Sequence, residues 1–298
     1  MTSKRNGGMQ SELERWRVKV GEHLRKCIAG DNEDCAELVG AMRYSLLAGG
    51  KRIRPILCVK FCEAAGGDPE AALDAACAIE ILHTYSLIHD DLPCMDDDDT
   101  RRGMPSNHIK YGEFTATLAG DALQAMAFGT LLRSGLPPGA VVLMARILAE
   151  AAGPRGICGG QYLDLSGVGK QLPAEELLKI HEMKTAALIT ASALIGVVAA
   201  GGTQEQLDAA EKYARAIGLA FQVRDDLLDC TATAQELGKP VGSDSVNDKT
   251  TLAVLLGIDE CEALIRSETD KAIAALGGVF EDVEFLTWLA RTLAERKY

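Results

Sequence analysis

Apolar residues recur at helical spacing along almost the whole chain, and this pattern predicts an all-α protein. Short polar segments rich in glycine and proline, such as Gly66–Pro69 and Gly135–Pro138, separate the apolar runs. No low-complexity linker divides the chain, so we expect a single domain over residues 1–298, with residues 1–10 disordered. The predicted helices cover residues 11–29, 33–48, 55–65, 69–92, 111–134, 138–152, 173–200, 203–229, 249–257, 259–276 and 280–296.

Two of these helices, 69–92 and 203–229, are apolar on most of their faces, and each ends in aspartates. A helix that is apolar nearly all round belongs in a protein core. We therefore expect a bundle of about ten or more helices around a central apolar cavity. The two helices would deliver their acidic ends to the mouth of that cavity.

Composition and charge narrow the classes of function. Hydrophobic residues make up 47% of the chain, which argues against intrinsic disorder. The net charge of −12 argues against nucleic acid as the main partner. It does not exclude an anionic substrate, because bound metal ions would reverse the local charge. The N-terminal residues lack the apolar core of a signal peptide, and we expect no transmembrane segment and a cytoplasmic location.

The nine cysteines show no C-x-x-C pair and no zinc-type spacing along the sequence. Most of them lie within apolar helical stretches. We therefore expect reduced thiols that act as small apolar residues of the core.

Two aspartate clusters carry the candidate chemistry, at Asp90–Asp99 and at Asp225–Asp229. So many carboxylates at the ends of apolar helices are costly unless cations bind between them, and oxygen ligands of this kind suit Mg²⁺. Pro93 should interrupt the first helix and bring Asp96 back toward Asp90. Either cluster alone would be read as a solvated acidic loop, but two clusters, each followed by basic residues, favour a metal site. The spacing is not that of an EF-hand.

A glycine-rich basic turn, Gly49–Pro55, is the second signal. The glycines let the backbone approach an anion, Lys51 and Arg54 are three residues apart, and Pro55 suits the start of a helix. On its own the turn would be a basic surface turn. Together with the aspartates it predicts a second diphosphate pocket that needs no metal.

Polar residues within apolar stretches extend the candidate site. His83 lies two helical turns before Asp90, Lys184–Thr185 begins an apolar run, and Gln222 precedes Asp225 by three residues. Buried polar groups of this kind need partners, which a phosphate or a transient cation could provide. The Gly159–Gln161 segment is predicted to be an architectural turn.

These motifs, in this order, resemble those of trans-prenyl diphosphate synthases. Residues 83–103 are similar to the first aspartate-rich motif of that family, and residues 221–229 to the second. The segments 49–55, 181–185 and 238–244 match its other signatures. The resemblance covers roughly residues 40–255 and implies an isoprenoid-synthase type of fold. It is strongest to the bacterial type of farnesyl diphosphate synthase.

The resemblance implies a metal centre and two diphosphate sites. Three Mg²⁺ ions, for which Mn²⁺ can substitute, would bind Asp90, Asp96 and Asp225, with Asp91, Asp229 and Asp244 ligating or supporting them through water. Arg101, Lys184, Lys239 and Lys249 would hold the allylic diphosphate. Gly50, Lys51, Arg54, His83 and Arg102 would hold isopentenyl diphosphate. Thr185 and Gln222 would offer oxygen dipoles to the allylic cation. The implied catalytic set is therefore Asp90, Asp96, Asp225, Lys184, Thr185 and Gln222.

The implied reaction is the head-to-tail condensation of isopentenyl diphosphate with dimethylallyl or geranyl diphosphate, carried out by a homodimer. Tyr85 and Ser86 stand five and four residues before Asp90, where the family sets chain length, and Tyr85 would be a floor for the growing tail. An aromatic residue there favours farnesyl diphosphate, the C15 product. The sequences of residues 92–95 and 181–185 resemble the corresponding segments of plant geranylgeranyl diphosphate synthases. This resemblance leaves a C20 product as the alternative.

Two remoter alternatives share part of this pattern. A class I terpene cyclase would carry a different second metal motif and would not need the basic pocket around Lys51 and Arg54. A non-catalytic regulatory subunit of a prenyl synthase would typically lose one aspartate cluster, and this chain keeps both.

Overall fold

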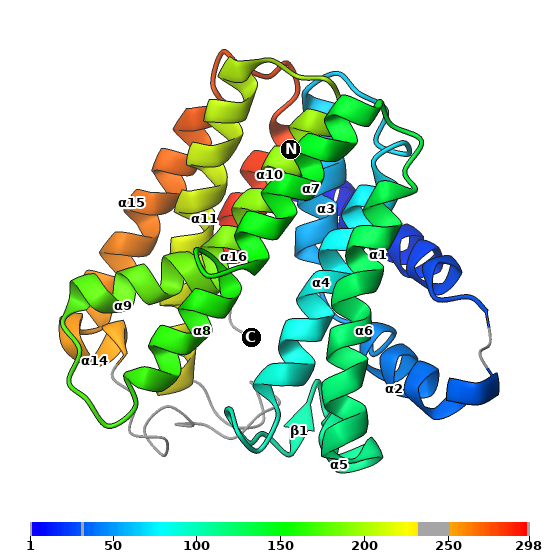
Figure 1. Ribbon diagram of the computed structural model, residues 1–298. Helices are drawn as coiled ribbons and strands as arrows, with labels where there is room; N and C mark the ends of the chain where they lie inside the picture. The colour runs from blue at the N-terminus through cyan, green and yellow to red at the C-terminus, as the bar shows by residue number, and fades with distance from the viewer. Residues whose placement is uncertain (1, 31–32, 232–250, 297–298) are drawn as a thin grey trace.

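The computed structural model describes residues 2–30, 33–231 and 251–296, and it confirms the all-α class. The strands of this described part are β1 (Thr100–Arg101) and β2 (Met104–Pro105), an antiparallel pair with Thr100 opposite Pro105. Figure 1 shows the helices arranged as one bundle. In chain order they are α1 (Thr2–Cys27), η1 (Glu33–Cys35), α2 (Ala36–Leu46), α3 (Ile53–Ala64), α4 (Leu73–Asp90), α5 (Asn107–Tyr111), α6 (Glu113–Leu132), α7 (Pro138–Ala152), α8 (Ile157–Ser166), α9 (Ala174–His181), the π-helical turn η2 (Glu182–Ala186), α10 (Ala187–Ala199), α11 (Gln204–Thr231), α14 (Leu252–Leu256), α15 (Ile258–Leu276) and α16 (Glu284–Ala294).

Helices α4 and α10, which are apolar on nearly all faces, form the centre of the core. The prediction of a core helix is confirmed for residues 69–92, which contain α4, whereas α11, from the predicted helix 203–229, has exposed polar positions in its first half and is amphipathic. Helix α4 packs against α3 and α6, and α10 packs against both α4 and α11. The acidic ends of α4 and α11 line the same cavity. By length and composition alone, one helical stretch of the described residues, Ala174–Ala199, could cross a membrane. Because 61% of its apolar window is buried inside the bundle, it also fits a core helix.

The structure corrects two sequence predictions about local order. Helix α1 already begins at Thr2, so the expected disorder of residues 1–10 is wrong for residues 2–10, and Met9 packs against the core. Gly159–Gln161 is not a turn but part of α8. Its glycines weaken the local helix signal, yet a Cβ on Gly160 would collide with the backbone of Lys184. Tertiary packing therefore outweighs intrinsic propensity in this segment.

The predicted helix 173–200 is also interrupted, because η2 inserts a π-helical turn that contains Lys184 and Thr185. Such turns occur often at functional sites, since the extra residue changes the direction in which side chains point. Farther along the chain, α16 buries an apolar face that includes Phe285 and Leu289. Its end brings Arg296 back to the end of α11.

Candidate active site

A cavity of about 420 Å³ lies between the ends of α4 and α11, and carboxylates approach it from several helices. The structure thus brings the two predicted aspartate clusters together. Its acidic lining residues are Asp90, Asp96 and Asp98 from the first cluster, Asp225, Asp226 and Asp229 from α11, and Asp164 from α8. Oxygen ligands supplied from facing walls fit the preference of Mg²⁺ for carboxylates and phosphate oxygens.

Beyond Asp90 the chain doubles back, as Pro93 predicted. The Asp96 amide donates to the Asp90 carbonyl over 2.9 Å, and the Met95 and Asp97 amides donate to the Leu92 carbonyl. Burial raises the pKa of Asp90 to about 6, with Lys184 opposing this shift and Asp96 adding to it. The turn therefore holds two carboxylates close together, where a cation would offset their repulsion.

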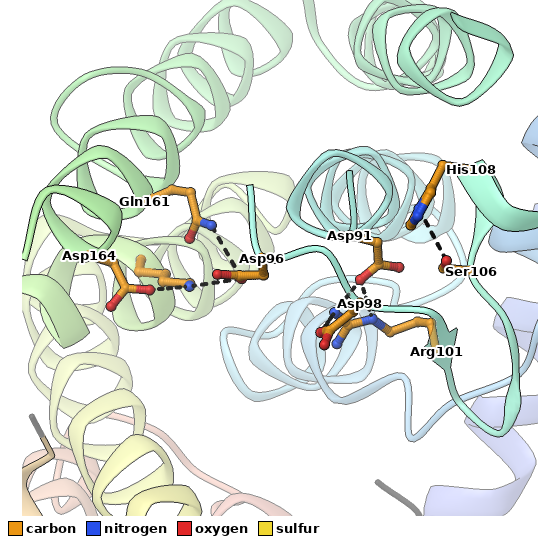
Figure 2. A network of polar contacts seen from close by, with 9 residues as sticks. Asp91, Asp96, Asp98, Arg101, Ser106, His108, Gln161 and Asp164 are labelled. Carbon is orange, nitrogen blue, oxygen red and sulfur yellow. Dashed lines mark hydrogen bonds and ion pairs between the residues drawn. The ribbon is translucent and has the colours of Figure 1, made fainter. Parts of the chain in front are cut away.

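Helix α8 supplies two polar residues that the sequence analysis did not assign to the site. Asp164 Oδ2 lies 2.7 Å from Lys184 Nζ, which is 4.0 Å from Asp96 Oδ2. Gln161 donates from Nε2 to Asp96 over 3.4 Å, and Figure 2 shows Gln161 and Asp164 on the same side of Asp96, away from Asp91 and Arg101. In the sequence, the only indication of this role was that Gln161 and Asp164 are three residues apart in an apolar segment and so share one helical face. Lys184 is thus held at the cavity between two carboxylates.

Asp91 was predicted to ligate or support the metal ions, and the structure gives it a different environment. Its buried carboxylate accepts two hydrogen bonds from Arg101, one of them over 2.9 Å, and it is not among the residues that line the cavity. Arg101 Nη2 also lies 3.2 Å from Asp98 Oδ2, and Figure 2 shows Asp91, Asp98 and Arg101 gathered in one group. The β1–β2 turn folds Arg101 back onto the end of α4, so Asp91 positions this arginine rather than facing the cavity.

On the opposite wall, Thr185 and Gln222 form a direct pair. Thr185 Oγ1 donates to Gln222 Oε1 over 2.8 Å, and Gln222 Nε2 donates to Asp226 over 3.2 Å. Asp226 also accepts from the Leu252 amide and lies 3.3 Å from His181 Nε2. These bonds fix the two dipoles that the sequence analysis assigned to the allylic cation.

Asp225 is paired with a residue that sequence reasoning missed. Arg296 Nη2 lies 2.6 Å from Asp225 Oδ1, and the guanidinium stacks 3.7 Å from the centre of the Phe221 ring. Arg296 also donates to the Phe221 carbonyl over 2.9 Å. The two residues are 71 positions apart in the sequence, so no local pattern pointed to this contact.

A second, basic cavity of about 300 Å³ adjoins the first, and Arg54 and His83 line both. The predicted residues Gly50, Lys51, Arg54, His83 and Arg102 all line it. Gly50 has a φ of +112°, and a Cβ placed on it would lie 2.9 Å from Arg102 Cζ. The glycine therefore lets the guanidinium of Arg102 reach the Gly49 carbonyl, 2.6 Å away.

Electrostatics make this second cavity suitable for an anion. Burial lowers the pKa of Lys51, Arg54 and Arg102. Burial first, and then the neighbouring guanidiniums, hold the pKa of His83 well below its usual range, so its imidazole is neutral beside Arg54. Within the described residues, the buried Arg54 Nε–H has no hydrogen-bond partner. A multiply charged phosphate would relieve both the cation crowding and this unmet donor.

The side chains of Ser86 and Tyr85, the two residues predicted to set chain length, lie in different environments. Ser86 lines the carboxylate cavity, one turn below Asp90. Tyr85 is 4% exposed; its hydroxyl lies 3.5 Å from Cys158 Sγ in α8, and its ring packs edge-on against His89. Tyr85 is not among the residues that line this cavity. Three further predicted residues, Lys239, Asp244 and Lys249, lie outside the described part of the chain.

Solved structures share both the fold and a substantial part of the sequence. A farnesyl/geranylfarnesyl diphosphate synthase from Zymomonas mobilis superposes with a TM-score of 0.86 at 34% identity, covering 97% of this chain and 99% of that one. A geranylgeranyl pyrophosphate synthetase from Pyrococcus horikoshii gives 0.88 at 32% identity, covering 97% and 99%.

Curated relatives are more similar in sequence. A chloroplastic geranylgeranyl pyrophosphate synthase from Capsicum annuum is 50% identical over 74% of this chain, which spans 61% of the length of that relative. The large subunit 1 of a heterodimeric geranylgeranyl pyrophosphate synthase from Arabidopsis thaliana is 46% identical, over 86% of this chain and 71% of its own. The polyprenyl synthetase family model matches residues 35–283, which include both aspartate clusters and the basic turn. This chain therefore belongs to the polyprenyl synthetase family.

Proposed function

We propose that this protein condenses isopentenyl diphosphate with allylic diphosphates and that its main product is the C20 compound geranylgeranyl diphosphate. One observation carries the reaction class: a carboxylate-lined cavity and a basic cavity adjoin and share Arg54 and His83. Such a pair of sites can hold two diphosphates side by side, one through metal ions and the other through cations of the protein.

The residues of the first cavity would bind and ionise the allylic substrate. Asp90, Asp96 and Asp225 would hold Mg²⁺, which would supply positive charge to offset the negative charge of the departing diphosphate. Lys184 and Arg101 line the same cavity, where they would hold the departing diphosphate. The paired oxygens of Thr185 and Gln222 would face the allylic cation on the opposite wall.

The residues of the second cavity would hold isopentenyl diphosphate. Arg54, Arg102 and Lys51 would bind its phosphates, and the neutral His83 would accept a hydrogen bond from Arg54. The double bond of isopentenyl diphosphate then attacks the cation, and the released diphosphate takes up the proton that is lost. Apolar side chains around the cavity would exclude water that could quench the cation.

The C20 product is supported by the names of the relatives and by the lining of the cavity. The two curated relatives described above are named geranylgeranyl pyrophosphate synthases. The small residue Ser86, rather than Tyr85, lines the cavity below Asp90, which leaves room for a longer tail. The aromatic residue Tyr85, five positions before Asp90, favours the C15 product, and farnesyl diphosphate is the second candidate on that ground. The Zymomonas mobilis neighbour is named as a farnesyl/geranylfarnesyl diphosphate synthase.

A second copy of this chain is the proposed partner. Large apolar side chains on α6 and at the start of α7 are exposed in a single chain: Phe114 is 75% exposed and Val142 68%. Leu118 and Leu132 add to this surface. Burying such residues between two copies would gain about 25 cal/mol per Å² of apolar area.

Incubation with Mg²⁺ and isopentenyl diphosphate, using dimethylallyl, geranyl or farnesyl diphosphate as the primer, tests the proposal. Chromatographic sizing of the dephosphorylated products should show mainly the C20 alcohol from all three primers, and none after chelation of Mg²⁺. A C15 end product that does not accept a further unit would instead favour farnesyl diphosphate. Absence of any condensation with folded protein would contradict the enzymatic proposal and favour a regulatory subunit.

A further inference from the structure

A group of soft metal ligands lies near the opposite end of α4 from the aspartates. His23 and Cys27 are four residues apart on α1, so they share one helical face, and Cys77 lies on the first turns of α4. One imidazole nitrogen and the two sulfurs all lie within 4.8 Å of one another. Cys77 and Asp90 are 13 positions apart on α4, which places this group about 20 Å along the helix from the candidate metal-binding carboxylates.

A carboxylate holds the imidazole of this group in place. Asp74 Oδ1 lies 2.7 Å from His23 Nε2, and Asp74 precedes Cys77 by three residues on the same helix. Histidines that bind metals usually bond a carboxylate or a carbonyl through the other ring nitrogen, which fixes the orientation of the ring. The His23–Asp74 pair would be such a supporting contact for a metal ion bound through Nδ1 of His23.

The ligands stand on rigid and packed elements. Helix α1 packs along α4, and Trp16, Val20 and Leu24 of α1 are buried against the core. Cys77 is fully buried, whereas the His23 side chain is 25% exposed. The group is thus buried at Cys77 and exposed to solvent at the imidazole of His23, where a metal ion could enter.

We propose that His23, Cys27 and Cys77 form a second metal site, for Zn²⁺ or a similar soft divalent ion, with Asp74 supporting the histidine. Thiolate and imidazole ligands select such ions over Mg²⁺. In tetrahedral zinc sites, Zn–S distances near 2.3 Å and Zn–N distances near 2.0 Å separate the ligand atoms by roughly 3.5–3.8 Å. The ligand atoms of this group lie within 4.8 Å of one another, so they would have to approach by about 1 Å to bind the ion. Water would complete the four ligands. Bound metal would join α1 to α4 and stabilise the bundle without entering the prenyl chemistry.

Titration of the full-length, reduced protein with Co²⁺ in excess Mg²⁺ tests this site. The expected result is one tetrahedral Co²⁺ per chain, with intense visible bands and a thiolate-to-cobalt charge-transfer band, displaced by Zn²⁺. Cys77→Ser and His23→Gln should abolish these bands, and Asp74→Asn should weaken the affinity roughly 10–100-fold. Cys35→Ala, an exposed cysteine outside the group, should leave them unchanged.

Thermal unfolding provides a second readout, because metal should raise the melting temperature of the wild type and not of His23→Gln. His23 is partly exposed, so this variant should fold even where the buried Cys77→Ser does not. The proposal fails if the Co²⁺ spectrum of the wild type shows no thiolate band. It also fails if the bands survive in His23→Gln. A third contrary outcome is a disulfide between Cys27 and Cys77, with no metal bound by the protein either before or after that disulfide is reduced.

Discussion

Arg296 forms an ion pair with Asp225, with 2.6 Å between Nη2 and Oδ1, and thus occupies an oxygen of a carboxylate in the candidate metal site. The same guanidinium lies over the Phe221 ring and lowers the pKa of Lys51 in the neighbouring basic cavity, in addition to the effect of burial there. Arg296, the last described residue, therefore links the carboxylate-lined cavity with the basic cavity.

Arg296→Ala should lower the Mg²⁺ concentration that gives half-maximal condensation, because the arginine and the metal compete for Asp225. Asp225 is 41% exposed as a side chain, so the pair is worth up to about 1 kcal/mol and the shift should be roughly fivefold. Arg296→Lys, which keeps the positive charge, is the matched control. A Mg²⁺ dependence that does not change in Arg296→Ala would contradict this competition.

Asp90→Asn and Asp91→Asn should give different defects, although the two residues are adjacent. Loss of Asp90 from the cavity should reduce kcat by at least about 10³-fold while the protein stays folded, in line with the loss of an electrostatic catalytic contact. Loss of Asp91 removes the buried acceptor of Arg101 and should cost about 2 kcal/mol of unfolding free energy. Urea unfolding and steady-state kinetics separate the two effects, with the exposed Asp97→Asn as the control. Equal defects in both variants would refute the distinct roles.

Gly50→Ala should weaken the binding of isopentenyl diphosphate, because a Cβ there meets the guanidinium of Arg102. Gly49→Ala is a close control: this glycine also has a positive φ, but a Cβ on it would have no atom within 4 Å. Both variants should lose about 1 kcal/mol of stability from backbone strain. Only Gly50→Ala should raise the KM for isopentenyl diphosphate, by roughly tenfold, which corresponds to one lost charge-assisted contact. A similar rise in Gly49→Ala would mean that strain alone explains the effect.

Ser86→Phe should shorten the product from C20 to C15, because Ser86 lines the cavity one turn below Asp90 and a phenyl ring there would fill the path of the tail. Sizing of the products by chromatography measures the shift. Tyr85→Ala tests the earlier prediction that Tyr85 is the floor. A longer product would support that prediction, and an unchanged product would leave Ser86 as the position that limits the chain.

The sequence by itself determined the all-α class, the positions of the aspartate clusters and the basic turn at Gly49–Pro55. Each of these depends on local properties: helical periodicity, proline and glycine at chain reversals, and charge density within a few residues. Even the return of Asp96 toward Asp90 followed from the local effect of Pro93. Such features can be predicted from the sequence because residues close together along the chain are enough to produce them.

Only the tertiary structure decided which side chains face one another. It turned Asp91 from the carboxylate-lined cavity to Arg101, made a helix of the glycine-containing α8 and so brought Asp164 to Lys184. It also brought Cys77 to the His23 face of α1 across more than fifty residues. These relationships depend on how helices that are distant in sequence pack and rotate against one another. The free energy of that packing is distributed over the whole core, so no short segment of the sequence predicts it.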